Sequence, residues 1–280
     1  MPEVIIEQVG ELLRHAARTA VLPMFGRLAD GDVTEKAPGE LVTVADRDAE
    51  RVISAGLRDL LPGSAVVGEE AVADDPAVLD RLGDAGAVWL VDPVDGTANF
   101  AAGRGPFMIM VALLRDGQTT AAWILDPRAD SLACARRGAG AYVDGVRVWA
   151  GDAARPATGL RGAVMARFLP APLGAQVRDR AEGLGVVLPG QHCAGQEYPD
   201  VVRGVQDFVL FWKTLPWDHA PGALFTEEAG GVVRRLDGSP YDPTDQRPFG
   251  LLAAASPPVW GQVRDALFPG EALGRVLAER

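Results

Sequence analysis

Cysteine and positive charge are both scarce in this sequence. Its 280 residues include two cysteines, Cys134 and Cys193, which are too few for a disulfide framework and fit no zinc-ligand spacing. The 27 Lys and Arg residues are outnumbered by 38 Asp and Glu residues, which leaves a net charge of -11. Sequence-independent binding to nucleic acid or to an anionic membrane needs clustered basic residues, so the composition argues against both kinds of partner.

Long hydrophobic runs are also missing. The longest apolar stretch, Phe107–Leu114, is far too short to cross a bilayer. The first residues are acidic and do not form the basic region and apolar run that are typical of a signal peptide. Because a low cysteine content also fits a reducing compartment, we expect a soluble protein of the cytoplasm.

Hydrophobic residues make up 48% of the chain, enough for the core of one large domain or two medium ones. Apolar residues recur at helical spacing over residues 4–20 and predict a helix that ends near Pro23. A second helix is expected to begin near Asp46 and to stop at Pro62. Apolar runs separated by turn dipeptides over residues 107–148 predict an antiparallel meander.

A stretch rich in Gly, Ala and Pro, "AGDAARPATG" at residues 150–159, predicts a junction between two domains. Beyond it, short apolar segments suggest strands that alternate with helices. We therefore expect an N-terminal α+β domain over residues 1–150, which carries acidic strand ends, and a C-terminal α/β domain over residues 151–280, which completes the site.

Acidic residues stand at the predicted ends of strands and helices: Asp46, Glu69, Asp92, Asp95 and Asp218. A rigid sheet can aim such side chains into a crevice. Each residue alone also has a structural explanation, because Asp-Pro and Asp-Gly are common turn dipeptides and Asp is a common N-cap. Glu70 is interpreted as a solvated residue, and His219 is expected to be exposed at the start of a helix.

If these carboxylates converge, they need compensating charge. Two like charges about 4 Å apart repel by roughly 4 kcal/mol at an effective dielectric near 20, so a cluster requires divalent cations or protons. All-oxygen ligation favours Mg²⁺, or Mn²⁺, over zinc. Two such ions could generate a hydroxide nucleophile and stabilise the leaving oxygen of a phosphate ester. The Gly96-Thr97 pair before a predicted helix would offer backbone N–H groups to the phosphate.

Several segments resemble the signatures of the inositol monophosphatase family, whose members are magnesium-dependent, often lithium-sensitive phosphatases of small phosphate esters. The matching segments, in order, are "LVTVADRDAE" (41–50), "GEE" (68–70), "DPVDGTANF" (92–100), "ARRGAGAYVDGVRV" (135–148) and "WDHAPG" followed by "EEAGG" (217–231). The resemblance covers most of the chain. It implies a layered αβαβα sandwich, combining α+β and α/β halves, and a homodimer.

The resemblance also implies the metal ligands. Glu69, Asp92 and the backbone carbonyl of Val94 would bind one Mg²⁺, and Asp92, Asp95 and Asp218 would hold a second. Asp92 would therefore bridge the two ions.

The remaining roles in the site follow from the same resemblance. Thr97, together with Glu69, would orient and deprotonate the attacking water. Asp46 would assist Thr97 or bind a third ion, and the N–H groups of Gly96 and Thr97 would hold the phosphate.

Residues 191–216 depart from the family pattern. Counting back from Asp218 places Phe211 where members that act on inositol phosphate carry an acidic residue. Phenylalanine cannot accept hydrogen bonds from sugar hydroxyls, so inositol 1-phosphate is in doubt as the preferred substrate. Contacts with a different leaving group are expected among Phe211, Lys213, Glu197, Gln196 and His192, although a loop or surface role also fits each polar one.

Other substrates and functions stay open at this point. Histidinol phosphate, fructose 1,6-bisphosphate and 3'-phosphoadenosine 5'-phosphate are further family substrates, and a non-catalytic protein that binds metal and a phosphate ligand is the alternative of another class. A phosphatase with a phosphorylated aspartate is disfavoured, because such enzymes use Asp-x-Asp whereas this chain has Asp92 and Asp95 with Pro93 between them.

Overall fold

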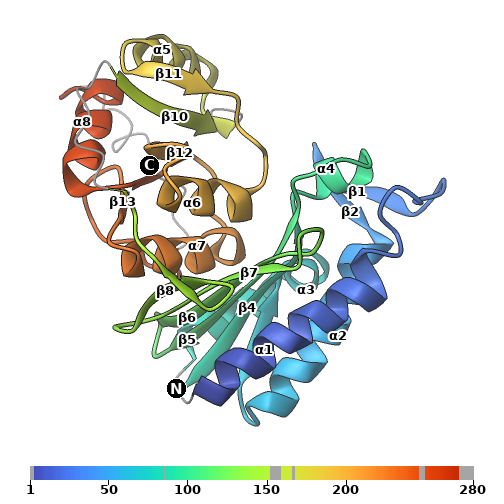
Figure 1. The fold of residues 1–280 in the computed structure, drawn as a ribbon. Coiled ribbons are helices and arrows are strands. Elements are labelled where there is room, and N and C mark those ends of the chain that lie inside the picture. Colours follow the sequence, from blue (N-terminus) through green and yellow to red (C-terminus); the bar gives the residue numbers. More distant parts are fainter. Residues whose placement is uncertain (1–2, 85, 152–158, 166–167, 246–249, 271–280) are drawn as a thin grey trace.

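Helices and sheets of this chain alternate in five layers. The computed structural model describes residues 3–84, 86–151, 159–165, 168–245 and 250–270. From one side to the other, the layers are two helices, a large sheet, two helices, a smaller sheet and two further helices (Figure 1). This confirms the expected αβαβα sandwich.

The first layer consists of α1 (Glu3–Ala16), which continues as a π-helical turn over Ala17–Val21, and α2 (Val44–Leu60). Both predicted helices are confirmed. In α2, apolar residues spaced by four lie on one buried face that packs on the sheet: Ala45, Ala49, Ile53 and Leu57. The N-cap is Thr43, whose backbone N–H and hydroxyl both donate to the Asp46 carboxylate in a capping box.

The larger sheet has seven strands in the order β3-β4-β5-β6-β7-β8-β9. They are β3 (Ala65–Gly68), β4 (Ala87–Asp95), β5 (Met108–Arg115), β6 (Gln118–Asp126), β7 (Ser131–Arg136), β8 (Gly140–Val143) and β9 (Val146–Val148). Only β3 and β4 pair in parallel, and β5 to β9 form the predicted antiparallel meander. Helices cover both faces of β4, which explains its nearly continuous apolar sequence.

The middle and outer layers complete the sandwich. The middle helices are α6 (Ala194–Val202) and α7 (Pro216–Glu228), and the outer ones are α5 (Ala171–Glu182) and α8 (Pro257–Leu267). Between them lies a sheet in the order β11-β10-β12-β14-β13, formed by β10 (Leu160–Met165), β11 (Gly185–Leu188), β12 (Phe208–Phe211), β13 (Val232–Arg235) and β14 (Leu251–Ala254). Strands and helices alternate from β10 to β13, as predicted, whereas β14 follows β13 without a helix among the described residues.

The two sheets come from different parts of the chain, with β3 to β9 before residue 150 and β10 to β14 after it. However, α7 belongs to the second part and packs on β5, β6 and β7 of the first sheet. The division into domains at residue 150 stays a prediction, and most of the predicted junction, residues 152–158, lies outside the described residues.

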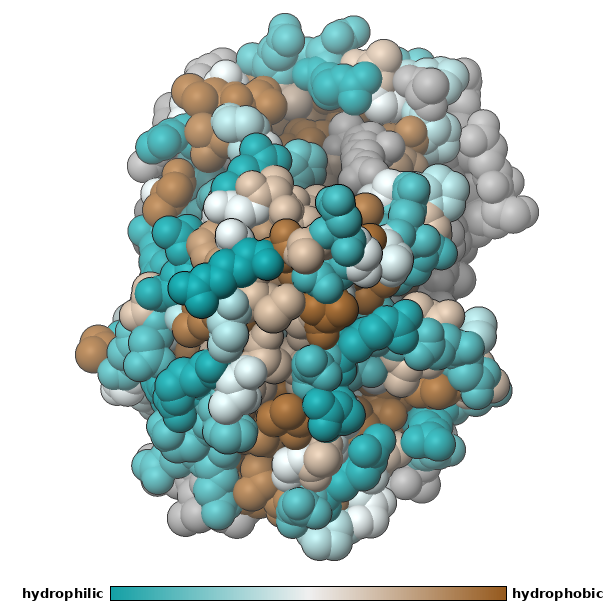
Figure 2. All heavy atoms as spheres, turned by 90° about the vertical axis from the view of Figure 1, so that its right-hand side faces the viewer, coloured by the Kyte–Doolittle hydropathy of each residue, from teal (hydrophilic) through white to brown (hydrophobic). Residues whose placement is uncertain are grey.

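Short elements gather near the carboxyl ends of β3 and β4. They are the hairpin of β1 (Val33–Ala37) and β2 (Glu40–Thr43), helix α3 (Glu69–Asp74), the 3-10 helix Pro76–Gly83, and α4 (Thr97–Ala101). On the face seen in Figure 2, which includes the side of the hairpin and α4, hydrophobic residues form small groups among hydrophilic ones. Within the described ranges, no helix has the length and apolar character that a membrane span requires.

Truncation of Ile53 should destabilise the first helical layer, because its side chain is fully buried between α2 and the large sheet. We expect Ile53→Ala to lower the free energy of unfolding by about 2–5 kcal/mol and Ile53→Val by about 0.5–1.5 kcal/mol. Urea denaturation of the three proteins measures this. Equal stability of Ile53→Ala and the parent would contradict the packing described here.

Candidate active site

Three acidic side chains from three different elements meet at one point. Glu69 begins α3 directly after β3, Asp92 lies near the end of β4, and Asp218 lies in the first turn of α7. One carboxylate oxygen from each lies within 4.8 Å of those of the other two. The three carboxylates line a pocket of about 210 Å³. The fold therefore brings residues from both parts of the chain into one acidic centre.

Burial and mutual repulsion make this centre unfavourable as bare charge. Burial raises the pKa of Asp92 well above its ordinary value, and the charges of Glu69, Asp95 and Asp218 raise it further. Burial likewise raises the pKa of Asp218, as do Glu69 and Asp95. A divalent cation would relieve both costs, and an all-oxygen donor set fits Mg²⁺ or Mn²⁺.

The chain turns sharply where β4 ends. The pairing register with β5 shifts between Asp92 and Asp95, and the backbone N–H of Val94 donates to Asp92 Oδ1 at 3.1 Å. Pro93 lies inside this irregularity and has no N–H to leave unpaired. This local structure separates the two aspartates and directs their side chains differently.

Asp95 is held by the middle helical layer. Its Oδ2 accepts hydrogen bonds from the backbone N–H of Gly195 at 2.5 Å and from Cys193 Sγ at 3.2 Å. Burial raises the pKa of Asp95 to about 6, although these hydrogen bonds oppose the shift. Asp95 therefore borders the group of Glu69, Asp92 and Asp218 while one of its oxygens is bound to the start of α6.

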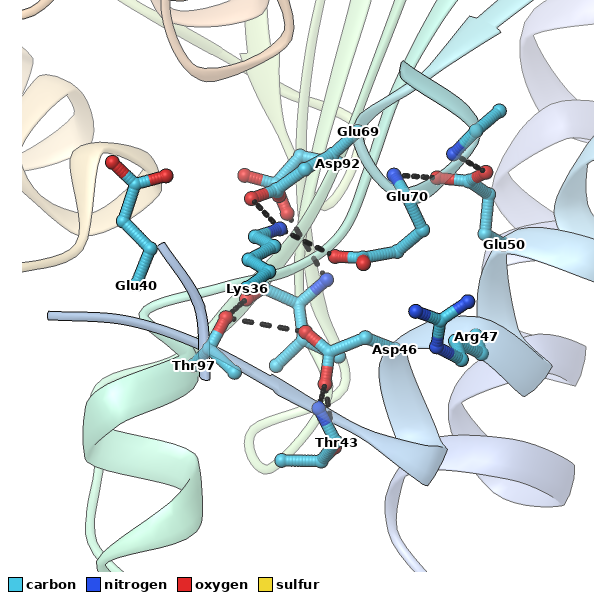
Figure 3. A network of polar contacts seen from close by, with 12 residues as sticks. Lys36, Glu40, Thr43, Asp46, Arg47, Glu50, Glu69, Glu70, Asp92 and Thr97 are labelled. Atoms are coloured by element: carbon cyan, nitrogen blue, oxygen red, sulfur yellow. Dashed lines mark hydrogen bonds and ion pairs between the residues drawn. The ribbon is translucent and has the colours of Figure 1, made fainter. Parts of the chain in front are cut away.

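Thr97 and Asp46 lie next to each other, below Glu69 and Asp92 in the view of Figure 3. Thr97 Oγ1 lies 3.1 Å from Asp46 Oδ1 and 2.9 Å from the carbonyl oxygen of Val94. Asp46 is fully buried, and burial raises its pKa to about 7; hydrogen bonds from Thr43 oppose the shift, whereas the charges of Glu70 and Glu69 add to it. The structure thus places a carboxyl group that titrates near neutral pH beside a hydroxyl group.

Gly96 permits the turn from β4 into α4. Its φ is 89°, and a Cβ at this position would lie 2.9 Å from the carbonyl oxygen of Pro106. The Asn99 side chain fixes the turn by donating to the carbonyl oxygens of Pro106 and Gln191, both at 2.9 Å. The first N–H groups of a helix lack intrahelical partners, and Gly96 and Thr97, with which α4 begins, both line the pocket.

Lys36 is a site residue that the sequence did not reveal. It reaches from the β1–β2 hairpin and donates to Glu69 at 2.6 Å and to Glu70 at 2.7 Å (Figure 3). Burial lowers the pKa of the Lys36 ammonium, but the two carboxylates outweigh this effect and raise it overall. The interpretation of Glu70 as a solvated residue is wrong, because Glu70 is buried and bound to Lys36.

Glu50 is a second residue that the sequence did not reveal. Its two carboxylate oxygens accept the backbone N–H groups of Glu70 at 2.8 Å and Ala71 at 2.9 Å, which belong to the first turn of α3. The N-cap of α3 is Gly68, which has no capping side chain, and a Cβ there would lie 2.3 Å from the Glu50 carboxylate carbon. Glu50 therefore caps α3 from another helix and fixes the turn that begins with Glu69.

The residues predicted to contact the leaving group fall into two sets. Phe211, Lys213 and His192 line the pocket. Gln196 and Glu197 are not among its lining residues: Gln196 donates to Asp200 at 2.7 Å, and Glu197 is buried and accepts hydrogen bonds from Gln191 and Gln206. We therefore do not propose that Gln196 or Glu197 contacts the substrate.

His219 is buried, so its expected exposure is wrong. One ring nitrogen lies 3.0 Å from the Tyr198 hydroxyl and the other 3.0 Å from the carbonyl oxygen of Lys213. Burial lowers the pKa of His219 to about 4, so the ring is neutral at physiological pH. Through these two contacts, His219 of α7 links α6 to the segment after β12.

Comparison with known proteins agrees with the geometry. A model of the inositol monophosphatase family matches residues 3–263. An inositol-1-monophosphatase of Mesorhizobium japonicum is 34% identical over 220 residues, covering 76% of this chain and 79% of the relative. A Nus factor SuhB of Vibrio cholerae is 30% identical over 234 residues, covering 80% and 81%. The crystal structure of the extragenic suppressor protein suhB from Bartonella henselae matches with a TM-score of 0.82 and 25% identity, over 96% of this chain and 100% of that one.

Glu50→Gln should weaken metal binding, because the amide offers one acceptor and places a donor against the second N–H of α3. We expect the affinity for Mg²⁺ to fall by about 10- to 100-fold. Calorimetric titration of metal-free protein, well below its unfolding temperature, measures this. Asp48→Asn, on the exposed side of the same helix, is the control. A lower melting temperature with unchanged affinity would limit Glu50 to a structural role.

The metal-free protein should lose stability as the pH rises. Burial raises the pKa values of Asp46 and Glu50 to about 7 and that of Asp95 to about 6, so their protons stabilise the fold at low pH and are lost as the pH passes these values. We expect the melting temperature in chelator to fall from about pH 5 to about pH 8, and Mg²⁺ to restore more of it at the higher pH. A metal-free melting temperature that rises over this range would contradict the assignment.

Proposed function

Because the chain belongs to the inositol monophosphatase family, we propose that it is a magnesium-dependent phosphomonoesterase that hydrolyses a small phosphate ester by attack of an activated water. Members of this family are phosphoric monoester hydrolases. The observation that carries the proposal is the convergence of Glu69, Asp92 and Asp218, within 4.8 Å of one another, beside Thr97 and the start of α4.

We assign the metal ligands as follows. Glu69, Asp92 and the carbonyl oxygen of Val94 would hold one Mg²⁺, and Asp92, Asp95 and Asp218 would hold a second, with Mn²⁺ as a substitute. The ions would lower the pKa of a water ligand and stabilise charge on the leaving oxygen. Asp46 is available for a third ion. The Val94 carbonyl could serve a metal although it lies 2.9 Å from Thr97 Oγ1, because a carbonyl oxygen has two lone pairs.

The chain's own contribution to the proton transfer lies in Thr97 and Asp46. Thr97 Oγ1 has one hydrogen, and when it points to the Asp46 carboxylate the lone pairs of Thr97 Oγ1 are free to accept from the attacking water. As the water gives a proton to Thr97 Oγ1, Thr97 passes its own hydroxyl proton to Asp46. Asp46 has a pKa of about 7, which suits a group that takes up a proton near neutral pH. Glu69 orients the water, and the N–H groups of Gly96 and Thr97 bind the phosphate oxygens.

A second candidate is a binding role without turnover, which the similarity to a protein named Nus factor SuhB favours. A catalyst needs its metal ligands and Thr97, and the chain has all of them. Turnover is therefore our first proposal. A homodimer and inhibition by lithium are further expectations from the family, and inositol 1-phosphate, histidinol phosphate, fructose 1,6-bisphosphate and 3'-phosphoadenosine 5'-phosphate form the first substrate panel.

Asp95→Asn should fold and lose most of its turnover, because a metal ligand loses its charge. We expect magnesium-dependent phosphate release from the best ester of the panel to fall by about 100-fold or more. The control is Asp265→Asn, an exposed carboxylate on α8. Near-normal release from Asp95→Asn at limiting Mg²⁺ would contradict the metal assignment.

A further inference from the structure

The pocket is lined by two unlike sets of residues. One set is the acidic centre and the Gly96-Thr97 turn. The other consists of four large apolar side chains, which we call the apolar wall: Met165, Phe168, Phe211 and Trp212. Both sets line one cavity of about 210 Å³, so an ester whose phosphoryl group binds at the acidic centre has its leaving group in the same cavity as the apolar wall.

Phe211 and Trp212 of the apolar wall are held in place by packing. Phe211 ends β12 and is 5% exposed; its ring stacks on Tyr198 at a centroid distance of 5.1 Å and meets His219 edge-on at 4.7 Å. Trp212 follows it and packs partly on the core of the smaller sheet. Flat, fixed apolar surfaces of this kind fit a planar ring better than a flexible or strongly hydrated group.

One residue of the apolar wall exposes apolar surface to solvent. Phe168 is 44% exposed, although it belongs to the pocket lining. The ammonium of Lys213 lies 5.4 Å from the centre of its ring. A ring that entered beside Phe168 would remove this surface from water, which is a favourable contribution to binding.

The polar groups near the apolar wall already have partners. Lys213 forms an ion pair with Glu40 of the β1–β2 hairpin. Both ring nitrogens of His219 are occupied, by Tyr198 and by the carbonyl oxygen of Lys213. Among the described lining residues, His192 is the polar side chain that is exposed. The hydroxyl groups of a polyol would thus lose water beside the apolar wall with few protein partners in return.

These observations point to one class of substrate. We infer that the leaving group is an aromatic ring system on a short alkyl arm, and that Phe168, Phe211 and Trp212 determine this specificity. The inference rests on the proposed phosphatase function, since it concerns the same pocket. It excludes a polyol as the preferred leaving group.

Paired esters of primary alcohols test this directly, because their bond cleavage is chemically alike. We compare 2-phenylethyl phosphate with glycerol 3-phosphate in Mg²⁺. The expected kcat/KM is about ten-fold or more higher for 2-phenylethyl phosphate than for glycerol 3-phosphate. A preference for glycerol 3-phosphate would overturn the inference.

Variants locate the effect. Phe168→Ala and Trp212→Ala should raise KM for 2-phenylethyl phosphate several-fold and should change KM for glycerol 3-phosphate by a smaller factor. Phe168 is partly exposed, so its variant is expected to fold even if the Trp212 variant does not. The control is Trp149→Ala, because Trp149 is 61% exposed and does not line the pocket. Equal losses with both esters would contradict a specificity role.

Binding without turnover separates this inference from the proposed function. Calorimetry in Mg²⁺ compares 3-phenylpropylphosphonate with 3,4-dihydroxybutylphosphonate, which are stable analogues of the two esters. Tighter binding of the phenyl compound, lost in Phe168→Ala, supports the apolar wall even if no ester is hydrolysed, in which case only the phosphatase proposal fails. Equal binding of the two phosphonates would overturn the inference whether or not turnover occurs.

Discussion

Repulsion among buried and half-buried carboxylates is the constraint on which the rest of the site depends. One carboxylate oxygen each of Glu69, Asp92 and Asp218 lies within 4.8 Å of the other two, and burial disfavours the charge of Asp92 and Asp218. Such a centre needs protons or cations to exist. One positive charge is already present, because the ammonium of Lys36 lies against Glu69 and Glu70. A divalent ion would answer the same need and also supply the chemistry of phosphate ester hydrolysis.

The fold opposes this repulsion because contacts from several layers hold the acidic residues in place. Helix α2 supports two sides of the site, since Asp46 contacts Thr97 and Glu50, one turn further on, caps α3. The start of α6 holds Asp95 through the N–H of Gly195. Strand β4, buried on both faces, is the rigid mount between these helices. The middle helical layer therefore supplies two groups of the site that the first sheet does not contain: the Asp218 carboxylate of α7 and the Gly195 N–H of α6.

The parts of the site that could be predicted from the sequence are those carried by local pattern. The strand that ends in Asp92 and Asp95 and the Gly96-Thr97 turn belong to one short segment, and helical spacing located α2. Lys36 and Glu50 could not be recognised, because their partners lie 33 and 20 residues away and no local pattern records such contacts. For the same reason the burial of His219, between α6 and the segment after β12, was not apparent.

Hydrolysis in ¹⁸O-labelled water tests the central claim most directly, namely that the carboxylate centre holds metal ions and directs water at phosphorus. The ester panel is incubated with the metal-free protein before and after Mg²⁺ is added, and the products are analysed by mass spectrometry. The account predicts release only with Mg²⁺, with one ¹⁸O atom in each phosphate and none in the alcohol. Label in the alcohol, release without metal, or no release from any ester while metal is bound would contradict it.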